Sequence, residues 1–281
     1  MKKLTFVIFN ILFCFSALGQ NSQDEILHHI VAEGWKLYIS EMASWHGTDI
    51  FLEKYTNKEH VGGYFSYADG GNMKNIFFSK GLVPKVIYSI TFDSTFNVNS
   101  AKVDTIERDF NKIEEDMFVI RSRAYLAIDG DTLFKSYEKS NFNLVPLISG
   151  GERKVYVLTA PKENGVVIFG NDYLLTFDNA NNLVSKKRLH KNIISAKYGY
   201  EDGKEAVGGF HTHLPETGDF ITPTDVCTIM LYEKLAKWKQ YCVVSKDFFS
   251  IWNCETDKLL MLTTKEAKAF SRRQGRKRKK N

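Results

Sequence analysis

Two long segments in the first half of the chain place apolar residues at the spacing of one helix face. In residues 22–44, Ser22 can cap a helix whose apolar positions recur every three or four residues. Residues 104–128 carry a longer apolar stripe, which Asp104 or Thr105 can cap. The stripe consists of Ile106, Phe110, Ile113, Met117, Ile120, Ala124 and Ile128. The pattern therefore predicts two amphipathic helices.

Short apolar runs between turn residues predict strands through most of the remaining chain. Residues 61–67 and 75–79 can pair as a hairpin across Asp69, Gly70 and Gly71. Proline cannot donate to a strand ladder, so Pro146 suits an edge strand or a linker. Further strands are predicted over 85–92, 141–148, 154–160, 166–169, 173–177, 183–190, 206–213, 241–245, 248–253 and 259–262.

One helix is predicted late in this strand-rich half, over residues 223–238. Thr222 stands at the N-cap and Pro223 at the first helical position, a favoured way to start a helix. The position that best suits a domain boundary is near Gly150 and Gly151. We expect an α/β (α+β) fold, with a mixed β-sheet and flanking helices in residues 150–270. A smaller α+β region is expected over residues 20–149.

The first 19 residues have the pattern of a secretory signal peptide. Lys2 and Lys3 precede an apolar run over residues 4–18, and Ala17 and Gly19 are small residues at a cleavage-site spacing. Cleavage is predicted before Gln20, so the protein is expected to be secreted or periplasmic. The alternative is a membrane anchor, but a spanning helix needs about 20 apolar residues. No later segment has the character of a transmembrane helix.

The basic character of the chain is concentrated at its carboxyl end. The formal charge is +5, but residues 271–281 alone carry seven basic residues and no acid. This tail is expected to be disordered and solvated, or else attracted to an anionic surface such as lipid headgroups. The chain has no RNA- or DNA-binding motif, so nucleic acid is not an expected partner.

Three cysteines follow the signal region, namely Cys227, Cys242 and Cys254. An odd number at irregular spacing does not form a disulfide framework. Two alternatives remain open, because Cys242 can pair with Cys254 across a hairpin or the thiols can be buried and free.

The strongest chemical feature is a pair of histidines followed by an aspartate at the start of the late helix. His211 and His213 would point the same way from a strand, because strand side chains alternate with period two. Asp225 would lie in the first helical turn, which favours a carboxylate electrostatically. Two histidines and a carboxylate, with a position left for water, suit catalytic zinc. The alternative is that the histidines are structural and Asp225 only caps the helix with Thr222.

Residues 207–238 resemble the JAMM (also called MPN or JAB) metalloproteases. The signature of this family is a Glu, a later His-Ser/Thr-His-Pro, a loop, and Ser-x-x-Asp at the start of a helix. His211-Thr212-His213 matches the histidine motif, and Thr222-Pro-Thr-Asp225 matches the last motif with Thr in place of Ser. Leu214 stands where the family usually has Pro, and the helix that commonly precedes the Glu is not evident. The resemblance extends over roughly residues 154–264.

The resemblance implies a JAMM/cytidine-deaminase-like domain with zinc bound by His211, His213 and Asp225. It also implies that Thr222 helps to stabilise an oxyanion and that an upstream glutamate acts as general acid and base. Glu163 is the candidate for that glutamate, although its surroundings are also typical of an ordinary turn. Lesser candidates are Glu205 and Glu216.

The function implied by this resemblance is that of a zinc-dependent hydrolase. It would cleave a peptide or isopeptide-like amide bond in a protein or peptide substrate. The alternative is a non-catalytic envelope or binding protein with the same fold and an inactive or structural metal site. His190 follows a basic run on a polar strand, so we expect its side chain to be exposed, and the alternative is that it reaches the metal site.

Overall fold

The computed structural model describes residues 2–198, 200–201 and 204–269; for 2–22, 200–201 and 204–205 it describes the backbone alone. The fold is of the mixed α+β class, as the sequence predicts. The basic tail over residues 271–281 lies outside the described residues, as do the side chains of the predicted signal peptide. Among the helices of the described residues, none has an apolar stretch long enough to cross a membrane.

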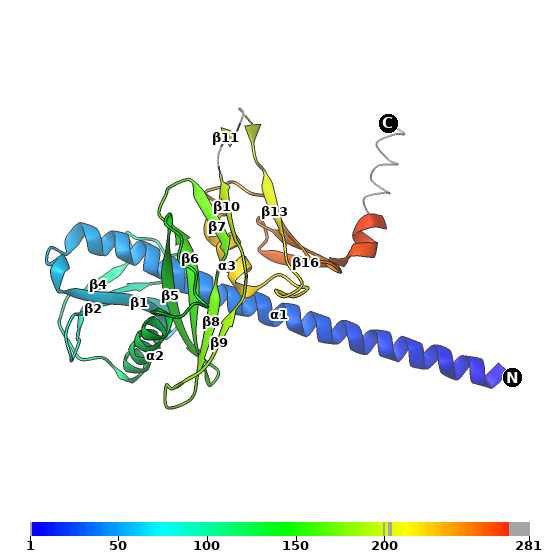
Figure 1. Cartoon of the computed structure of the whole chain (residues 1–281), viewed down its shortest axis with the longest axis horizontal. Helices are drawn as coiled ribbons and strands as arrows, with labels where there is room; N and C mark the ends of the chain where they lie inside the picture. Colours follow the sequence, from blue (N-terminus) through cyan, green and yellow to red (C-terminus); the bar gives the residue numbers. More distant parts are fainter. Residues whose placement is uncertain (1, 199, 202–203, 270–281) are drawn as a thin grey trace.

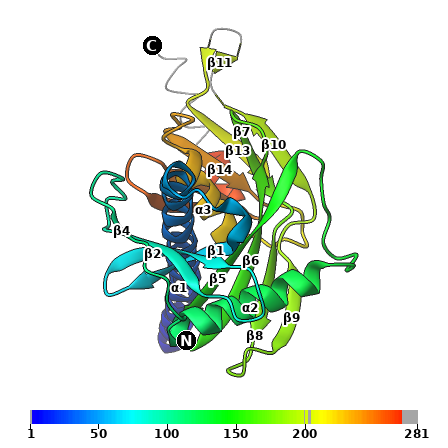
Figure 2. The ribbon, with the colours of Figure 1, turned by 90° about the vertical axis from the view of Figure 1, so that its left-hand side faces the viewer.

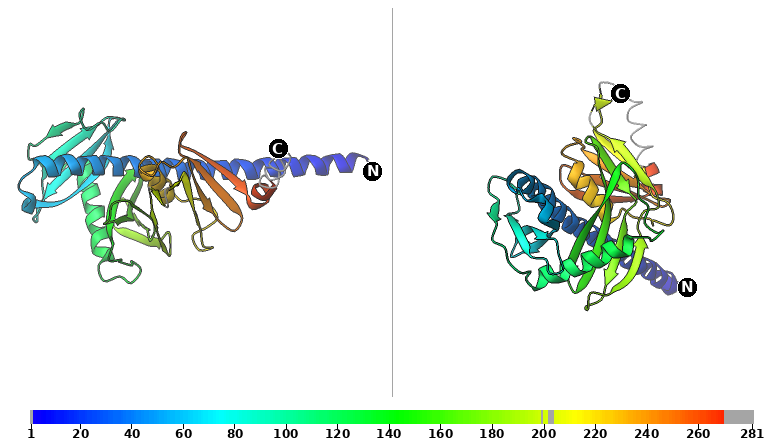
Figure 3. Two further views of the ribbon diagram at one scale, coloured as in Figure 1. Left: turned by 90° about the horizontal axis from the view of Figure 1, so that it is seen from above. Right: turned by 60° about the vertical axis from the view of Figure 1, so that its left-hand side comes forward.

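Helix α1 (Lys2–Lys54) runs past two of the sheets and contacts both halves of the molecule (Figures 1 and 3). Leu37, Ser40 and Ala43 lie on the buried face of α1 and are almost fully buried. The small side chains of Ser40 and Ala43 let the helix approach its neighbours closely. A Cβ atom on Gly34 would lie 2.7 Å from Val226 in helix α3 (Pro223–Tyr232), so the two helices can meet at this distance only because residue 34 is glycine.

The first sheet has the strand order β1-β2-β3-β4 and covers α1 with one of its faces. Its strands are β1 (Val61–Asp69), β2 (Asn72–Ser79), β3 (Val86–Phe92) and β4 (Lys102–Asp104). Asp69 pairs with Asn72, which confirms the predicted hairpin across Gly70 and Gly71. Phe77 packs toward α1, whereas the adjacent Phe78 packs toward α2 on the other face.

Helix α2 (Lys112–Ile128) begins well after Asp104, so the predicted start of this helix was wrong. Asn111 and Glu114 form a reciprocal capping box that fixes the first turn. Residues 105–111 before this helix are not helical, and Arg108 forms an isolated β-bridge with Val86. Ile106, which the apolar stripe included, is 73% exposed.

The second sheet has the strand order β5-β6-β8-β9 and packs against α2 (Figure 2). Its strands are β5 (Ser140–Ser149), β6 (Glu152–Pro161), β8 (Tyr173–Phe177) and β9 (Leu183–Arg188). Pro146 lies on the edge strand β5, as its lack of an N–H predicts. Gly150 and Gly151, where the sequence suggests a domain boundary, form the turn of the β5–β6 hairpin, so residues on both sides of this turn belong to one sheet.

The remaining strands complete the part of the fold that contains helix α3. They are β7 (Val166–Gly170) paired with β10 (Ile193–Lys197), β11 (Tyr200–Glu201) paired with β12 (Lys204–Glu205), and the sheet of β13 (Gly208–Thr212), β14 (Gln240–Val244), β15 (Phe248–Asn253) and β16 (Lys258–Thr263). Helix α3 packs between β7 and the sheet that contains β14 and β15. β13 and β14 are parallel and α3 connects them. This crossover brings the end of β13 close to the start of α3. The helix ends at Tyr232, six residues before the predicted end at Trp238, and the chain then turns through a positive φ at Lys237.

The three cysteines that follow the signal region, Cys227, Cys242 and Cys254, are free thiols. Cys242 lies opposite Ile251 in the β14–β15 pair, so it does not face Cys254. Cys227 is buried in α3. Of the two alternatives that the sequence leaves open, the structure therefore has free thiols and not a disulfide between Cys242 and Cys254.

Candidate metal centre

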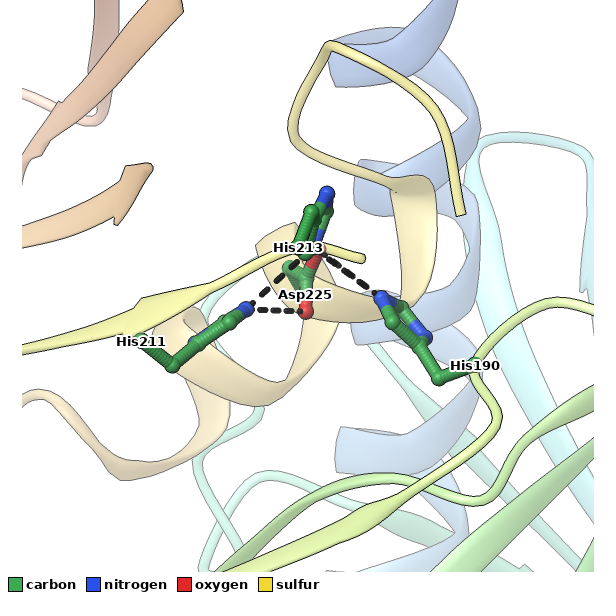
Figure 4. A group of neighbouring side chains, drawn as sticks. All are labelled: His190, His211, His213 and Asp225. Atoms are coloured by element: carbon green, nitrogen blue, oxygen red, sulfur yellow. Dashed lines mark hydrogen bonds and ion pairs between the residues drawn. The ribbon is translucent and has the colours of Figure 1, made fainter. Parts of the chain in front are cut away.

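His211 and His213 point to the same side of the chain at the carboxyl end of β13 (Figure 4). Both are buried, whereas Thr212 between them is exposed. The backbone N–H of His213 donates to Val244, which continues the pairing with β14 beyond the strand. The alternation that the sequence predicts is confirmed for these three residues.

Asp225 completes the group from the first turn of α3. It is only 1% exposed, and its carboxylate lies 3.3 Å from His211 Nε2 and 3.1 Å from His213 Nε2. Thr222 caps the helix and holds this carboxylate in place. Its N–H and its hydroxyl both donate to Asp225 Oδ2, at 2.9 and 2.7 Å. The hydroxyl proton of Thr222 is therefore engaged by Asp225.

His190 is the fourth member of the group, and the expectation that it is exposed was wrong. The loop between β9 and β10 carries it into the interior, where it is 7% exposed. Its Nε2 atom lies 3.1 Å from His213 Nε2, and its Nδ1 atom lies 2.6 Å from the carboxylate of Asp172. Asp172 is itself buried between β7 and β8, and Leu189 donates a backbone hydrogen bond to it. His190 and Asp172 are thus brought to the site by strand pairing, not by a local motif.

The ring nitrogens that face away from the centre differ in their partners. His190 Nδ1 has Asp172, and His211 Nδ1 lies 3.3 Å from the hydroxyl of Tyr241. A Cβ atom on Gly209 would lie 2.7 Å from the Tyr241 ring, so this glycine admits the ring beneath β13. Among the described residues, His213 Nδ1 is buried without a partner. An outer partner on Nδ1 fixes the tautomer that leaves Nε2 free to bind a metal.

The spacing of the inner atoms fits one metal ion. Bonds of about 2.0–2.1 Å in a tetrahedral zinc site separate the ligand atoms by roughly 3.3 Å. The measured separations among the three Nε2 atoms and the Asp225 oxygens include 3.1, 3.3 and 3.6 Å. All four donor atoms lie within 4.8 Å of one another. If the three imidazoles are neutral and protonated on Nδ1, the lone pairs of their Nε2 atoms point at each other and repel. A cation between them would remove this repulsion.

The electrostatics of the group also favour a cation. Burial alone would lower the pKa of His190, but the charges of Asp225 and Asp172 outweigh it and raise the pKa to about 11. Burial would raise the pKa of Asp225, but His190 and His211 hold it well below its usual range. Two buried carboxylates thus need positive charge beside them. A divalent metal can supply it when His190 gives up its proton.

A cavity of about 390 Å³ opens beside the imidazoles. His190 and His211 form part of its wall, so the centre can be reached from this side. The other lining residues are Tyr137, Phe169, Gly170, Lys191, Asn192, Ile193, Ile194, Thr212, Leu214 and Thr217. Within the described part of the chain, no carboxylate lines this cavity.

The candidate glutamates lie elsewhere. Glu163 is half-exposed, lines a different cavity, and forms an ion pair with Lys139 at 3.0 Å. Glu216 is exposed and lies 3.4 Å from Lys191. The side chain of Glu205 lies outside the described residues. The structure therefore brings together His211, His213 and Asp225, with Thr222 as the cap, but does not bring Glu163 to them.

Replacing Asp172 with asparagine is expected to weaken metal binding about 10–100-fold, because outer partners of ligating histidines contribute that much. The amide keeps the shape but removes the charge that orients His190 Nδ1. Competition with a chromophoric chelator measures the change. Asp219→Asn, in the exposed loop before α3, is the matched control and should leave affinity unchanged. Equal affinities for the two variants would contradict this role of Asp172.

Comparisons with family models, curated proteins and solved structures found no match to the chain.

Proposed function

We propose that the protein is an exported, zinc-dependent hydrolase that cleaves amide bonds in peptides or proteins. The observation that carries this proposal is the convergence of His190, His211, His213 and Asp225 next to a cavity. Zinc bound there would act as a Lewis acid and activate water for attack on a carbonyl group. The signal-peptide pattern over residues 1–19 supports action outside the cytoplasm.

The order of the ligands along the chain supports the relation to JAMM metalloproteases. Two histidines leave the end of β13, and the aspartate opens the helix that follows, with Thr222 as its cap. This is the arrangement that the matched motifs imply in the family. Zinc is the metal we propose, because the donor set of imidazoles and one carboxylate and the spacing of about 3.3 Å suit it.

The roles of the surrounding residues follow from their contacts. Asp172 and Tyr241 hold two of the imidazoles, so that Nε2 of each faces the centre. Lys191 and Asn192 give the cavity its polar wall, where they can donate hydrogen bonds to a peptide carbonyl. The ring centroids of Phe169 and His211 are 5.0 Å apart, and Phe169 gives the same cavity an apolar side.

A second candidate function is favoured by two features of the same site. All four ligands of a zinc ion would come from side chains, and such a closed set is typical of structural rather than catalytic zinc. In addition, no carboxylate among the described residues lines the cavity to move a proton. A non-catalytic envelope or binding protein with a structural metal site would have both features.

The experiment that separates the two functions is a hydrolysis assay on the zinc-loaded protein. A mixture of synthetic peptides and isopeptide-linked peptides is incubated with the wild type and with His211→Ala, and new termini are counted by mass spectrometry. The hydrolase proposal predicts cleavage by the loaded wild type alone, with loss of at least about a hundredfold in the variant. Stoichiometric zinc without any cleavage would instead support the non-catalytic function.

A further inference from the structure

A second cavity of about 380 Å³ lies away from the metal centre. Helix α1 forms one wall, and the end of α3 and the turn between β6 and β7 form the others. Asp225 lies in the first turn of α3 and Tyr232 is its last residue. These two residues, one at each site, are therefore about 10 Å apart along the helix axis. The volume is within the range of small-molecule pockets, which is about 300–1,000 Å³. Its lining includes Glu41, Trp45, Asp49, Tyr64, Asn143, Glu163, Tyr198 and Tyr232.

The charged residues of this cavity are all acidic. Glu41, Asp49 and Glu163 line it, and no lysine or arginine does so within the described chain. Lys139 offsets the charge of Glu163, with which it forms an ion pair at 3.0 Å. Among the described residues, neither Glu41 nor Asp49 has a basic partner. The Glu41 carboxylate accepts one hydrogen bond, from Asn143 at 2.6 Å.

Aromatic rings form a continuous side of the same cavity. Tyr232 lies between Trp45 and Tyr198, with ring centroids 6.2 and 6.1 Å apart. Trp45 lines the cavity and is 42% exposed, so part of its ring remains open to a ligand. The faces of such rings attract cations, and more strongly when water is excluded. The rings and the unpaired carboxylates therefore favour the same kind of ligand.

The carboxylate of Glu41 is a polar group on the wall of the same cavity. Burial raises the pKa of Glu41 to about 7, and the hydrogen bond from Asn143 offsets only part of that effect. A carboxylate can accept more than the single hydrogen bond from Asn143, so a ligand with N–H donors would satisfy the acceptor positions of Glu41 that remain.

We propose that this cavity binds an organic cation that carries an ammonium or guanidinium group on an apolar stem. The stem lies along Trp45, Tyr232 and Tyr198, and the charged group reaches Glu41. Lysine and arginine side chains of a peptide have this chemistry, and so do free polyamines. The site is independent of the metal centre and of the proposed hydrolase activity.

Calorimetric titration of the full chain tests the proposal with three probes. They are Nα-acetyl-lysine amide, its neutral isostere Nα-acetyl-norleucine amide, and spermidine. We expect saturable binding of at least one cation and none of the norleucine compound. Preference for the lysine amide identifies a peptide-borne side chain, and preference for spermidine identifies a free polyamine. Failure of both cations to bind, or equal binding of the neutral isostere, would overturn the proposal.

The decisive variant is Glu41→Gln, which keeps the shape of the side chain and removes its charge. It should weaken cation binding by at least about tenfold, because hydrogen bonds to charged groups contribute that much. Glu163→Gln is the matched control in the same cavity and should have little effect, since Lys139 already offsets Glu163. Trp45→Ala changes an exposed ring and should also weaken binding. Unaltered binding in both Glu41→Gln and Trp45→Ala would contradict the assignment.

Folding of the variant is checked separately. The folded pKa of Glu41 is raised to about 7 from its ordinary 4.5, so its favourable contribution is present below 4.5 and is lost as the pH rises through 7. Glu41→Gln should therefore have a melting temperature at least equal to that of the wild type at pH 8. Its zinc content should also be unchanged, which separates loss of this site from failure of the metal centre.

Discussion

One equivalent of zinc is expected to remain with the purified wild type, and both His190→Ala and His211→Ala are expected to lose it. Each variant removes one of four converging donors. The affinity should therefore fall by more than the 10–100-fold typical of an outer partner. Metal analysis after dialysis measures the stoichiometry, and titration against a chelator measures the affinity.

Thermal unfolding gives a second measurement of the same prediction. A ligand that binds only the folded state stabilises it by about 4 kcal/mol when its concentration is a thousand times its dissociation constant. Chelation should lower the melting temperature of the wild type and leave that of the two variants nearly unchanged. His60→Ala is the control, because His60 is exposed in the short helix η1 (Lys58–His60).

The two variants also distinguish a four-ligand from a three-ligand centre. If His190→Ala keeps its zinc and His211→Ala does not, the ligands are His211, His213 and Asp225, with a position open to water. That outcome would contradict His190 as a ligand and would favour the hydrolase. His190 lies between two buried carboxylates, so circular dichroism must show that its variant is folded.

The sequence predicts the metal ligands whose positions depend only on neighbouring residues in the chain. Strand alternation puts His211 and His213 on one side, and helix capping by Thr222 puts Asp225 at the start of α3. His190 and Asp172 obey no such rule, because they are 18 residues apart and meet only after β7, β8, β9 and β10 have paired. A sequence pattern of period two or 3.6 carries no information about such contacts.

Glu163 shows a different limit of local reasoning. It precedes β7, whose two ends reach different cavities. Val166 lines the second cavity, which contains Glu41, and Gly170 lines the cavity at the metal centre. A motif match gives the position of a glutamate in the sequence. The direction of β7 decides whether a residue before this strand lies at the metal centre or at the second cavity. Here that direction places Glu163 beside Lys139.

Helix α2 shows how a local capping contact can override a long apolar period. The stripe that begins at Ile106 predicts a helix from Asp104, but the capping box of Asn111 and Glu114 requires a non-helical backbone at Asn111. Its carboxylate accepts the N–H of Asn111 at 2.8 Å and a bidentate pair of bonds from Arg108 at 2.6 and 2.8 Å. The competing cap was present in the sequence, as Asn111 followed three residues later by Glu114.

Removal of the Glu114 carboxylate is expected to destabilise the fold strongly. Glu114 is fully buried, and it also accepts a hydrogen bond from the Tyr67 hydroxyl at 2.7 Å. Glu114→Ala should lower the free energy of unfolding by about 3 kcal/mol, because it leaves Arg108 and Tyr67 without their partner and removes half of the cap. Urea unfolding measures the loss.

The matched control is Glu115→Ala in the same turn of α2. Glu115 is exposed and forms only a surface ion pair with Lys112, so its loss should change stability by less than about 0.5 kcal/mol. Burial alone would raise the pKa of Glu114, but Arg108 and Asn111 outweigh it and lower the pKa below its ordinary 4.5. The stability that Glu114 contributes is thus present above pH 4.5 and is lost as the pH falls through the folded pKa. The difference between wild type and Glu114→Ala should therefore shrink in acid, and equal losses in the two variants at pH 7 would contradict the structure of this cap.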